Sequence, residues 1–489
     1  MIRITRTVGL FLLVLTTLAT GASAQFSLLH SFSGPDGSSP TGLIQTADGS
    51  FYGAAANGGD VTACNPDGCG TIFKSDPAGH FSVLHTFHAA DGIFPTGLVR
   101  GTDGNFYGTT MAGGAPSGGG AGVIFRIDPA GNFKILSTFT GGFACCDGGG
   151  PTGPPFQASD GNFYGTTGAG GASRNIHHQG GFGTVYQYNP VRGVVSIIHS
   201  FAFDGDGFYP NSPLISGPGG LLYGTTSQGS GPFRDGPGTA FKIDATGNFS
   251  VVGVLAGQPL SGLTLASDGF FYATAQGTIG GYVLRMDAAG ALTFVNNFDG
   301  ADGWKPRSRL LQASDGFFYG TAPQGGLLDF QGGDMFRISP TGALSILHSF
   351  STTGPEGFSP NTQLIQGLDG ALYGTTGIGG PNRHGTVFRF DQSIPASIAS
   401  VSVSPVTIHS GQRSTGTVKL SKPAPPGGMV VNLGAQQGQI VIPTKITIPA
   451  GATKRTFVIK TLSIFAASTV RIYAHAAGQG VRTTITVLP

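Results

Sequence analysis

The chain has 489 residues, of which 85 are glycine and 36 are phenylalanine, and its formal net charge is only +2. All but one of its 24 acidic residues are aspartate, and Glu356 is the single glutamate. Aspartate and glycine suit turns whereas glutamate suits helices, so this composition excludes a helical protein and favours a loop-rich all-β fold.

The first 24 residues have the pattern of a secretory signal peptide. Arg3 and Arg6 precede an apolar run over 8–18, which leads to the small-residue sequence ASA before Gln25. The run is shorter than a membrane-spanning helix, and no later stretch reaches the ~20 apolar residues that a span needs. We therefore expect a secreted protein, extracellular or periplasmic, without a membrane span.

A short motif then recurs seven times along the chain. The sequence DGNFYGTT occurs without change from Asp103 and from Asp160, and weaker copies begin at Asp48, Gly219, Asp268, Asp315 and Asp369. Successive copies lie 47 to 59 residues apart. Two further motifs keep step with it, typified by TVFRFD from Thr386 and LSILHSF from Leu344.

Each unit contains four short segments with the alternation of strands, which in the second unit cover 97–100, 106–110, 123–128 and 133–139. Four strands in about 50 residues are typical of a β-propeller blade. The chain opens with an unaccompanied outer strand, 26–32, and its seventh unit lacks a fourth strand. We predict that this strand completes the last blade of a seven-bladed propeller over residues 25–392, which removes an exposed sheet edge.

The repetition is interpreted as structural. Asp-Gly forms the hairpin turn, the aromatic residues of the motif pack between neighbouring blades, and its glycine allows close approach of the sheets. Histidine recurs at one strand position in four units, and we interpret these histidines as packing residues rather than ligands: His30, His85, His199 and His348.

The combination of DGNFYGTT, GG in the next loop, GTVFR and LHSF resembles the GloVer tandem repeat of bacterial exported proteins. The resemblance covers residues 26–391. It implies a scaffold without catalytic residues to transfer. Members of that group often end in a cell-surface sorting tail, whereas this sequence ends TTITVLP.

Residues 393–397, SIPAS, read as a linker, and residues 398–489 contain about seven alternating segments. That number of strands in about 90 residues predicts an immunoglobulin-like β-sandwich, here without cysteine. The run ITIPAGATKRTFVIKT resembles small Ig-like modules of bacterial secreted proteins, which implies a spacer or adhesive unit.

The two regions have opposite charges. Residues 398–489 hold nine Lys or Arg and no acid, and two further arginines lie in the leader, so 15 basic residues of the 26 remain against all 24 acids. The formal charges are −9 for residues 25–397 and +9 for residues 398–489. Such asymmetry indicates different partners, or each other as partners. We hypothesise that the basic module attaches the protein to an anionic surface such as an envelope polysaccharide; a plain spacer is the alternative.

Candidate ligand-binding residues lie in the long loops, which differ from unit to unit, because function is commonly added to variable loops on a rigid scaffold. One segment combines an aromatic ring with cations suited to sugars or anions: Trp304, Lys305, Arg307 and Arg309. Burial of Trp304 between blades is the alternative. Other loops contribute Arg174, His177, His178, Phe233, Arg234, Asp235, Arg383 and His384.

Metal binding by the loop residues is a weaker hypothesis. His177 and His178 are adjacent without a third ligand nearby. The loops between units repeat an acid, at Asp36, Asp91, Asp147, Asp206, Asp302 and Glu356. These acids either cap their own turns or attract calcium; we favour turns and predict no cofactor. Cys64 and Cys69 are spaced to form a disulfide within one loop, while Cys145 and Cys146 leave the connectivity open.

The predicted innermost strands contain no Asp or Glu; their polar residues include Gln45, Arg100, Gln157, Arg309, Gln312 and Gln366. Such groups bind ligands but are poor at proton transfer. We therefore predict a monomeric, secreted, non-catalytic binding propeller for an extracellular or envelope glycan, or for a protein partner, with cell-surface association through the basic module. Nucleic acid is not expected as a ligand, because the propeller is acidic. The alternative is a polysaccharide-degrading glycosidase or lyase.

Overall fold

The computed structural model describes residues 26–489 except 65, 77, 116–118, 142–146, 172–180, 203–204, 230–235, 260, 278–279, 301, 326–330, 392–396, 422–423, 425–427, 437, 450–451 and 477–478. The predicted signal peptide lies outside the described residues. Within them the regular structure is almost entirely β, with one 3-10 turn, η1 (Pro218–Gly220). No helix in this part of the chain is long and apolar enough to span a bilayer. The predicted all-β class is confirmed.

The first four sheets each follow the order of the chain, with antiparallel neighbours. The first contains β2 (Ser38–Gln45), β3 (Phe51–Asn57), β4 (Thr71–Ser75) and β5 (Phe81–Thr86), and the second β6 (Ile93–Arg100), β7 (Phe106–Ala112), β8 (Val123–Ile127) and β9 (Phe133–Thr138). The third contains β10 (Gly149–Pro151), β11 (Phe156–Gln157), β12 (Phe163–Ala169), β13 (Thr184–Asn189) and β14 (Val194–Ser200). The fourth contains β15 (Phe208–Pro210), β16 (Ile215–Ser216), β17 (Leu222–Gln228), β18 (Thr239–Ile243) and β19 (Phe249–Val254).

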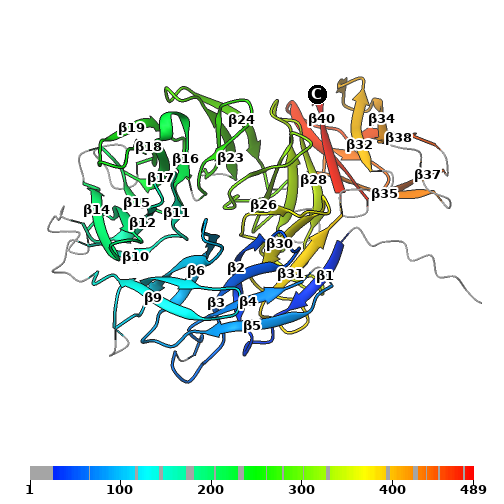
Figure 1. Cartoon of the computed structure of the whole chain (residues 1–489). Helices are drawn as coiled ribbons and strands as arrows, with labels where there is room; N and C mark the ends of the chain where they lie inside the picture. Colours follow the sequence, from blue (N-terminus) through cyan, green and yellow to red (C-terminus); the bar gives the residue numbers. More distant parts are fainter. Residues whose placement is uncertain are drawn as a thin grey trace, which may run out of the picture.

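Three more sheets repeat the plan. The fifth contains β20 (Gln258–Pro259), β21 (Thr264–Leu265), β22 (Phe271–Gln276), β23 (Gly281–Met286) and β24 (Leu292–Phe298). The sixth contains β25 (Leu311–Gln312), β26 (Phe318–Ala322), β27 (Asp334–Ile338) and β28 (Leu344–Ser349). The last combines β29 (Ile365–Gln366), β30 (Leu372–Thr376) and β31 (Thr386–Phe390) with β1 (Phe26–Ser31) from the other end of the chain. Figure 1 shows these sheets arranged around a common centre, as in a β-propeller.

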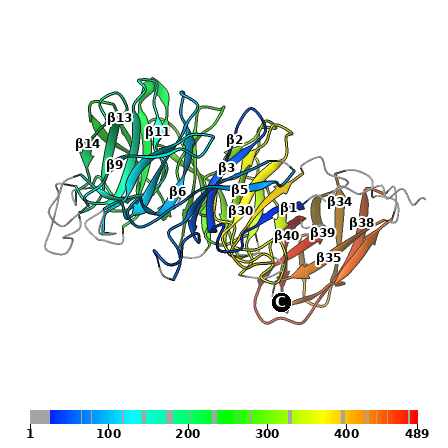
Figure 2. The same cartoon turned by 60° about the horizontal axis from the view of Figure 1, so that its bottom comes forward.

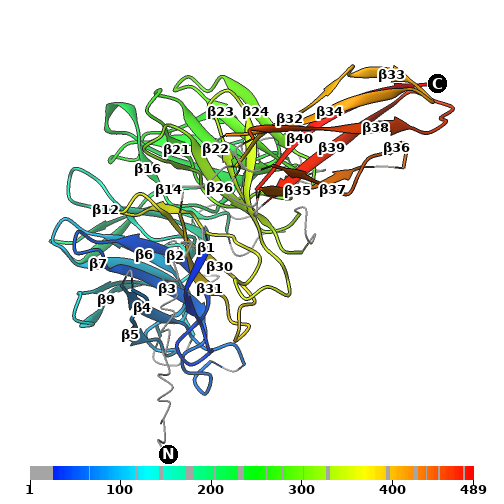
Figure 3. The same cartoon turned by 90° about the vertical axis from the view of Figure 1, so that its right-hand side faces the viewer.

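The first strand is the outermost strand of the last sheet. β1 runs antiparallel to β31, with Phe26 opposite Phe390 and Ser31 opposite Thr386. Figure 3 shows β1 and β31 close together, although 360 residues separate Phe26 from Thr386 in the chain. The sequence predicted this strand exchange, and it pairs the outer edge of β31 with a strand.

The aromatic residues of the repeated motif pack between neighbouring sheets, as predicted. The Phe106 ring lies 4.2 Å from the Tyr52 ring of the preceding sheet, and Phe163 lies 4.2 Å from Tyr107. The tyrosine hydroxyl in turn donates to the aspartate of its own turn, at 2.8 Å from Tyr107 to Asp103. The motif therefore stabilises both the hairpin and the contact with the next sheet.

The glycine of the motif acts within one sheet, not between sheets as predicted. A Cβ atom on Gly108 would collide with the ring of Phe125, which lies opposite it on the neighbouring strand. The fifth unit shows the same rule in reverse: it has Ala273 in place of glycine, and the opposing residue is Leu284 instead of phenylalanine. An aromatic ring on the third strand therefore requires glycine at the opposing position of the second strand.

Residues 398–489 form a second module of two sheets that share one apolar core. One sheet has the order β32 (Ile398–Ser404), β34 (Arg413–Leu420), β38 (Lys454–Thr461) and β36 (Ile440–Val441). The other has the order β40 (Gln479–Leu488), β39 (Ser468–Ala476), β35 (Met429–Ala435) and β37 (Lys445–Ile448), with β33 (Thr407–His409) parallel to β40. Figure 2 shows this module against one side of the propeller.

The module contacts the outer edge of the sixth sheet. β40 continues that sheet beyond β28 through a bridge between Gly480 and Ile346. Beside the bridge, Arg482 forms ion pairs with Asp299 and Asp302, both at 2.6 Å. Arg471 forms a third ion pair, with Asp299, at 3.1 Å. We call Asp299, Asp302, Arg471 and Arg482 the joint.

Candidate binding channel

The repeated sheets enclose a central cavity of about 250 Å³. Each of the seven sheets contributes one segment from within its innermost strand or directly before it: 41–44, 96–98, 152–154, 211–213, 261–262, 307–309 and 361–363. A tandem repeat brings one position of every unit to the same axis, so the composition of this segment decides the chemistry of the cavity. We call this cavity the channel.

Hydroxyl groups fix the wall of the channel. Thr225 on β17 lies 3.0 Å from the Ser212 hydroxyl of its own sheet, and it donates to the carbonyl oxygen of Ser261 in the next sheet. Equivalent bonds to the next sheet run from Thr109 to Gly153, Thr166 to Ser212, Thr274 to Ser308 and Thr321 to Thr362. These bonds hold the wall in place without a ligand, as a binding site requires.

The only charged side chains among the lining residues are Arg307 and Arg309, both from the sixth unit. Arg307 is exposed, whereas Arg309 is partly buried, and burial lowers the pKa of its guanidinium to about 10. Among the described residues the Arg309 side chain makes a single hydrogen bond, a long one of 3.4 Å from Nε to the hydroxyl of Thr264. Among the described residues no carboxylate pairs with either arginine. A buried cation without a counter-charge is costly, so the channel favours an anion.

The remaining predicted binding residues lie away from the channel. Trp304 is half-buried in its loop, where its amide donates to the carbonyl of Gln324 at 2.6 Å and its ring lies near Gly300. Lys305 is next to it with a left-handed φ of 54°. Arg383 is exposed, and His384 lies 3.2 Å from the Ser38 hydroxyl of the first sheet. The structure therefore separates Arg307 and Arg309 from Trp304, Lys305, Arg383 and His384.

Several candidates fall outside the described residues: Arg174, His177, His178, Phe233, Arg234, Asp235, Cys145 and Cys146. Among the described residues, no group of three or more His, Cys, Asp or Glu side chains is placed to hold a metal ion.

The innermost glutamines join the sheets to each other. The Gln157 amide oxygen accepts from the backbone N–H of Thr102 in the preceding sheet at 2.8 Å. Gln312 and Gln366 accept in the same way from Ser267 and Ser314. The sequence indicated these glutamines only as possible ligand contacts, because their bonds join residues 45 to 55 positions apart.

The repeated loop acids cap their turns, and three of them also form hydrogen bonds with the repeated histidines. Asp36 accepts from the Ser33 amide at 2.7 Å and from His30 Nε2 at 2.9 Å. The His30 ring stacks 3.6 Å from that of Phe81 in the next sheet, and burial lowers the pKa of His30. Asp91 with His85 and Asp206 with His199 repeat this contact. Their carboxylates are thus engaged by the protein itself.

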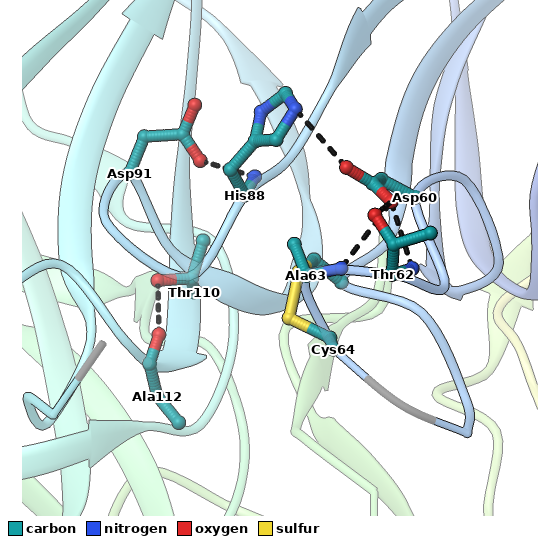
Figure 4. The surroundings of a disulfide bond; sticks show 9 residues. Asp60, Thr62, Ala63, Cys64, His88, Asp91, Thr110 and Ala112 are labelled. Carbon is teal, nitrogen blue, oxygen red and sulfur yellow. Dashed lines mark hydrogen bonds and ion pairs between the residues drawn. A yellow bond between two sulfur atoms is a disulfide. The ribbon is translucent and has the colours of Figure 1, made fainter. Parts of the chain in front are cut away.

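A disulfide joins Cys64 and Cys69 within the loop after β3 (Figure 4). Asp60 begins that loop by accepting from the amide and hydroxyl of Thr62, and its other oxygen lies 3.4 Å from His88 of the next loop. Cys69 is fully buried. The bond fixes the loop between β3 and β4, and no residue of this loop lines the channel.

Repeated four-stranded sheets around a lined channel define the molecule as a repeat-based β-propeller. The sequence profile of the Gloeobacter/Verrucomicrobia repeat matches residues 15–233, 61–277 and 219–404, so the chain belongs to the family of this repeat. No match was found among curated proteins.

Solved structures with a similar chain path are distant. A protein from Lactobacillus plantarum is 17% identical with a TM-score of 0.43, over 64% of this chain and 84% of its own. The Dos1 propeller is 9% identical with a TM-score of 0.43, over 75% of this chain and 96% of its own. A gluconolactonase from Xanthomonas campestris is 15% identical with a TM-score of 0.37, over 60% of this chain and 85% of its own.

Proposed function

We propose that the protein is an exported, non-catalytic binding propeller whose channel receives an acidic unit of an extracellular glycan. In this proposal the seven sheets are the blades of a closed ring, and residues 398–489 are an immunoglobulin-like sandwich that serves as an anchor. The observation that carries the proposal is Arg309, a partly buried cation in a channel rich in hydroxyl groups, with no counter-charge among the described residues.

The closed ring is supported by the contacts between the first and last sheets. Phe51 lies 4.3 Å from Tyr373, which repeats the aromatic pair seen between successive sheets. The Gln45 amide oxygen accepts from the Leu368 amide at 2.8 Å, which repeats the glutamine bond. The seam therefore uses the same bonds as the interior of the repeat.

A binding role is favoured over catalysis by the chemistry of the lining. Its residues include no Asp, Glu or His, so the channel has no group suited to proton transfer near neutral pH. It offers hydroxyls, amides and two guanidinium groups, which bind sugar hydroxyls and carboxylates. Its volume is small compared with typical ligand pockets, which suits one sugar unit and not a long chain. A glycosidase or lyase would need carboxylates there.

The test is a thermal-shift titration of the exported chain with D-glucuronate and with D-glucose. We expect glucuronate to raise the Tm in a dose-dependent way and glucose to raise it less. Arg309→Gln should abolish the glucuronate shift, and the fold should tolerate it because the last unit has Gln363 at the equivalent position. Arg192→Gln removes an exposed arginine far from the channel and serves as the charge-matched control.

A second variant blocks the channel without changing its charge. Gly262 has an ordinary φ, and other units have proline, arginine or glutamine at this position, so Gly262→Phe fills the channel with little backbone strain. It should abolish the glucuronate shift, whereas Trp304→Ala should leave it intact. A shift that survives both Arg309→Gln and Gly262→Phe would refute the channel as the site. Release of new reducing ends from a polyuronate would favour the enzymatic alternative.

A further inference from the structure

One sheet of the C-terminal module has like charges opposite each other on its outer face. The register of β34 and β38 places Arg413 opposite Lys460 and Lys419 opposite Lys454. All four side chains are exposed, and none of them forms an ion pair with another described residue. We call these four residues the cationic face.

The cationic face works against folding. Like charges that are directly opposite on neighbouring strands destabilise a sheet, and this module contains no acid that could relieve them. By contrast, Arg471 and Arg482 of the same module are neutralised at the joint. Residues that destabilise their own fold, and that have no compensating partner inside the protein, are expected at functional sites.

The spacing of the charges describes the partner. Arg413 and Lys419 are six positions apart along β34, which is about 20 Å in a strand. Between the two cationic pairs the face presents the hydroxyl-bearing side chains of Thr415, Thr417 and Thr456. A hollow beside β36, β37 and β38, which Lys460 also lines, adds two further cations: Lys445, and Arg455 next to Lys454.

We propose that the cationic face binds a linear, carboxylate-bearing polysaccharide that lies along β34 and β38. Carboxylates meet the two cationic pairs, and sugar hydroxyls meet the threonines between them. This inference rests on the anchor role in the proposed function and names its partner. A nucleic acid fits less well, because its phosphates are much more closely spaced and the outward positions of these strands offer no aromatic ring for base stacking.

The experiment measures retention of the exported chain on alginate, a linear polyuronate, with neutral dextran as the comparison. The test variant is Lys419→Thr with Lys454→Thr, and the matched control is Lys134→Thr with Arg192→Thr, which removes the same charge from exposed propeller positions. We expect the test variant to bind alginate about tenfold more weakly, with a shallower dependence on salt. The control should bind like the wild type, and dextran should retain none of them.

A second measurement separates binding from general damage. Because the opposed lysines repel each other, the test variant without alginate should melt about 1 °C higher than the wild type, even though it binds less. Equal alginate affinity of the test variant and the control would overturn the proposal. So would stronger retention on double-stranded DNA or on anionic lipid vesicles than on alginate. The test variant should keep the wild-type thermal shift with D-glucuronate, so failure of the channel and failure of the cationic face are separate outcomes.

Discussion

The repeated sheets of residues 26–391 and the two sheets of residues 398–489 are stabilised in different ways. In the propeller, most sheets contact the next through an aromatic pair or a threonine bond of the same kind, several add a glutamine bond, and almost every unit has its own turn aspartates. The C-terminal module has one core, no acid, and two arginines that find their counter-charges only on the propeller. The stability of the propeller is therefore shared among equivalent contacts between its sheets. The stability of the C-terminal module depends in part on its contact with the propeller.

The sixth unit is where the two regions meet, and it departs from the repeat there. Threonines at the start of the third strand donate to the carbonyl of the loop acid, as Thr71 does to Asp36 at 3.0 Å and Thr386 to Glu356 at 2.7 Å. The sixth unit has Asp334 at this position, fully buried, and neither of its carboxyl oxygens has a hydrogen-bond partner among the described residues. A neutral carboxyl group, like threonine, has a hydroxyl to donate.

The largest expected effect is therefore one of pH on the propeller. Burial raises the pKa of Asp334 from 3.8 to about 8, so the folded state keeps a proton that the unfolded state loses above pH 4. Stability from this group is highest at low pH and falls as the pH rises toward 8, by up to about 1.4 kcal/mol per unit. Asp334→Thr should remove this loss.

The measurement is the free energy of unfolding of wild type and Asp334→Thr between pH 5 and 9. The difference in the free energy of unfolding, in favour of Asp334→Thr, should grow up to about pH 8 and then level off. Asp302, whose pKa burial raises to about 7, remains in both proteins, and its charge also raises the pKa of Asp334. An advantage that is the same at every pH would show that Asp334 is ionised throughout.

The seam between the first and last sheets should be as sensitive as any contact inside the repeat. Tyr373 is buried against Phe51, so Tyr373→Ala should cost about 3–4 kcal/mol. Tyr373→Phe loses only the hydrogen bond to Asp369 and should cost about 1 kcal/mol. Denaturant unfolding measures both, and Tyr107→Ala is the comparison inside the repeat. A much smaller cost at the seam would mean that the ring is not closed there.

Breaking the joint should affect the contact between the regions more than either fold. Arg482→Ala leaves Asp302 buried without its cation, and because Arg482 is itself 31% exposed we expect a cost of about 2–3 kcal/mol. Asp302→Asn in the same chain should recover most of it. The rate of proteolysis between the two regions measures the loss of contact, and unfolding curves measure the loss of stability. Independent, additive costs of the two substitutions would show that the pair is not coupled.

The smallest effect tests the packing rule of the repeat. Leu284→Phe places a ring over Ala273, where other units have glycine, and should cost about 1–2 kcal/mol through overpacking. Ala273→Gly in the same chain makes room for the ring and should restore stability. The C-terminal module should unfold unchanged in both variants. A double variant no better than Leu284→Phe alone would contradict the rule.

The sequence by itself determined the repeat, the strand positions and the strand exchange at residues 26–32, because these depend on local turn chemistry and alternation that seven copies make unmistakable. It also indicated Arg307 and Arg309, and it raised the possibility that two oppositely charged regions are each other's partners. The sequence grouped these arginines with Trp304, however, because it does not show which of several adjacent residues line the channel and which lie in the loop beside it.

Only the tertiary structure decided which residues meet at the axis and at the joint. The channel collects one short segment from each sheet, Gln157 and Gln312 become contacts between sheets, and Arg482 finds Asp302 across 180 positions. The physical reason is that charge neutralisation and burial depend on distance in space. A single sequence records the residue types that require these contacts. The arrangement of the sheets around one axis decides which of them are satisfied, and it leaves Arg309 without a counter-charge among the described residues.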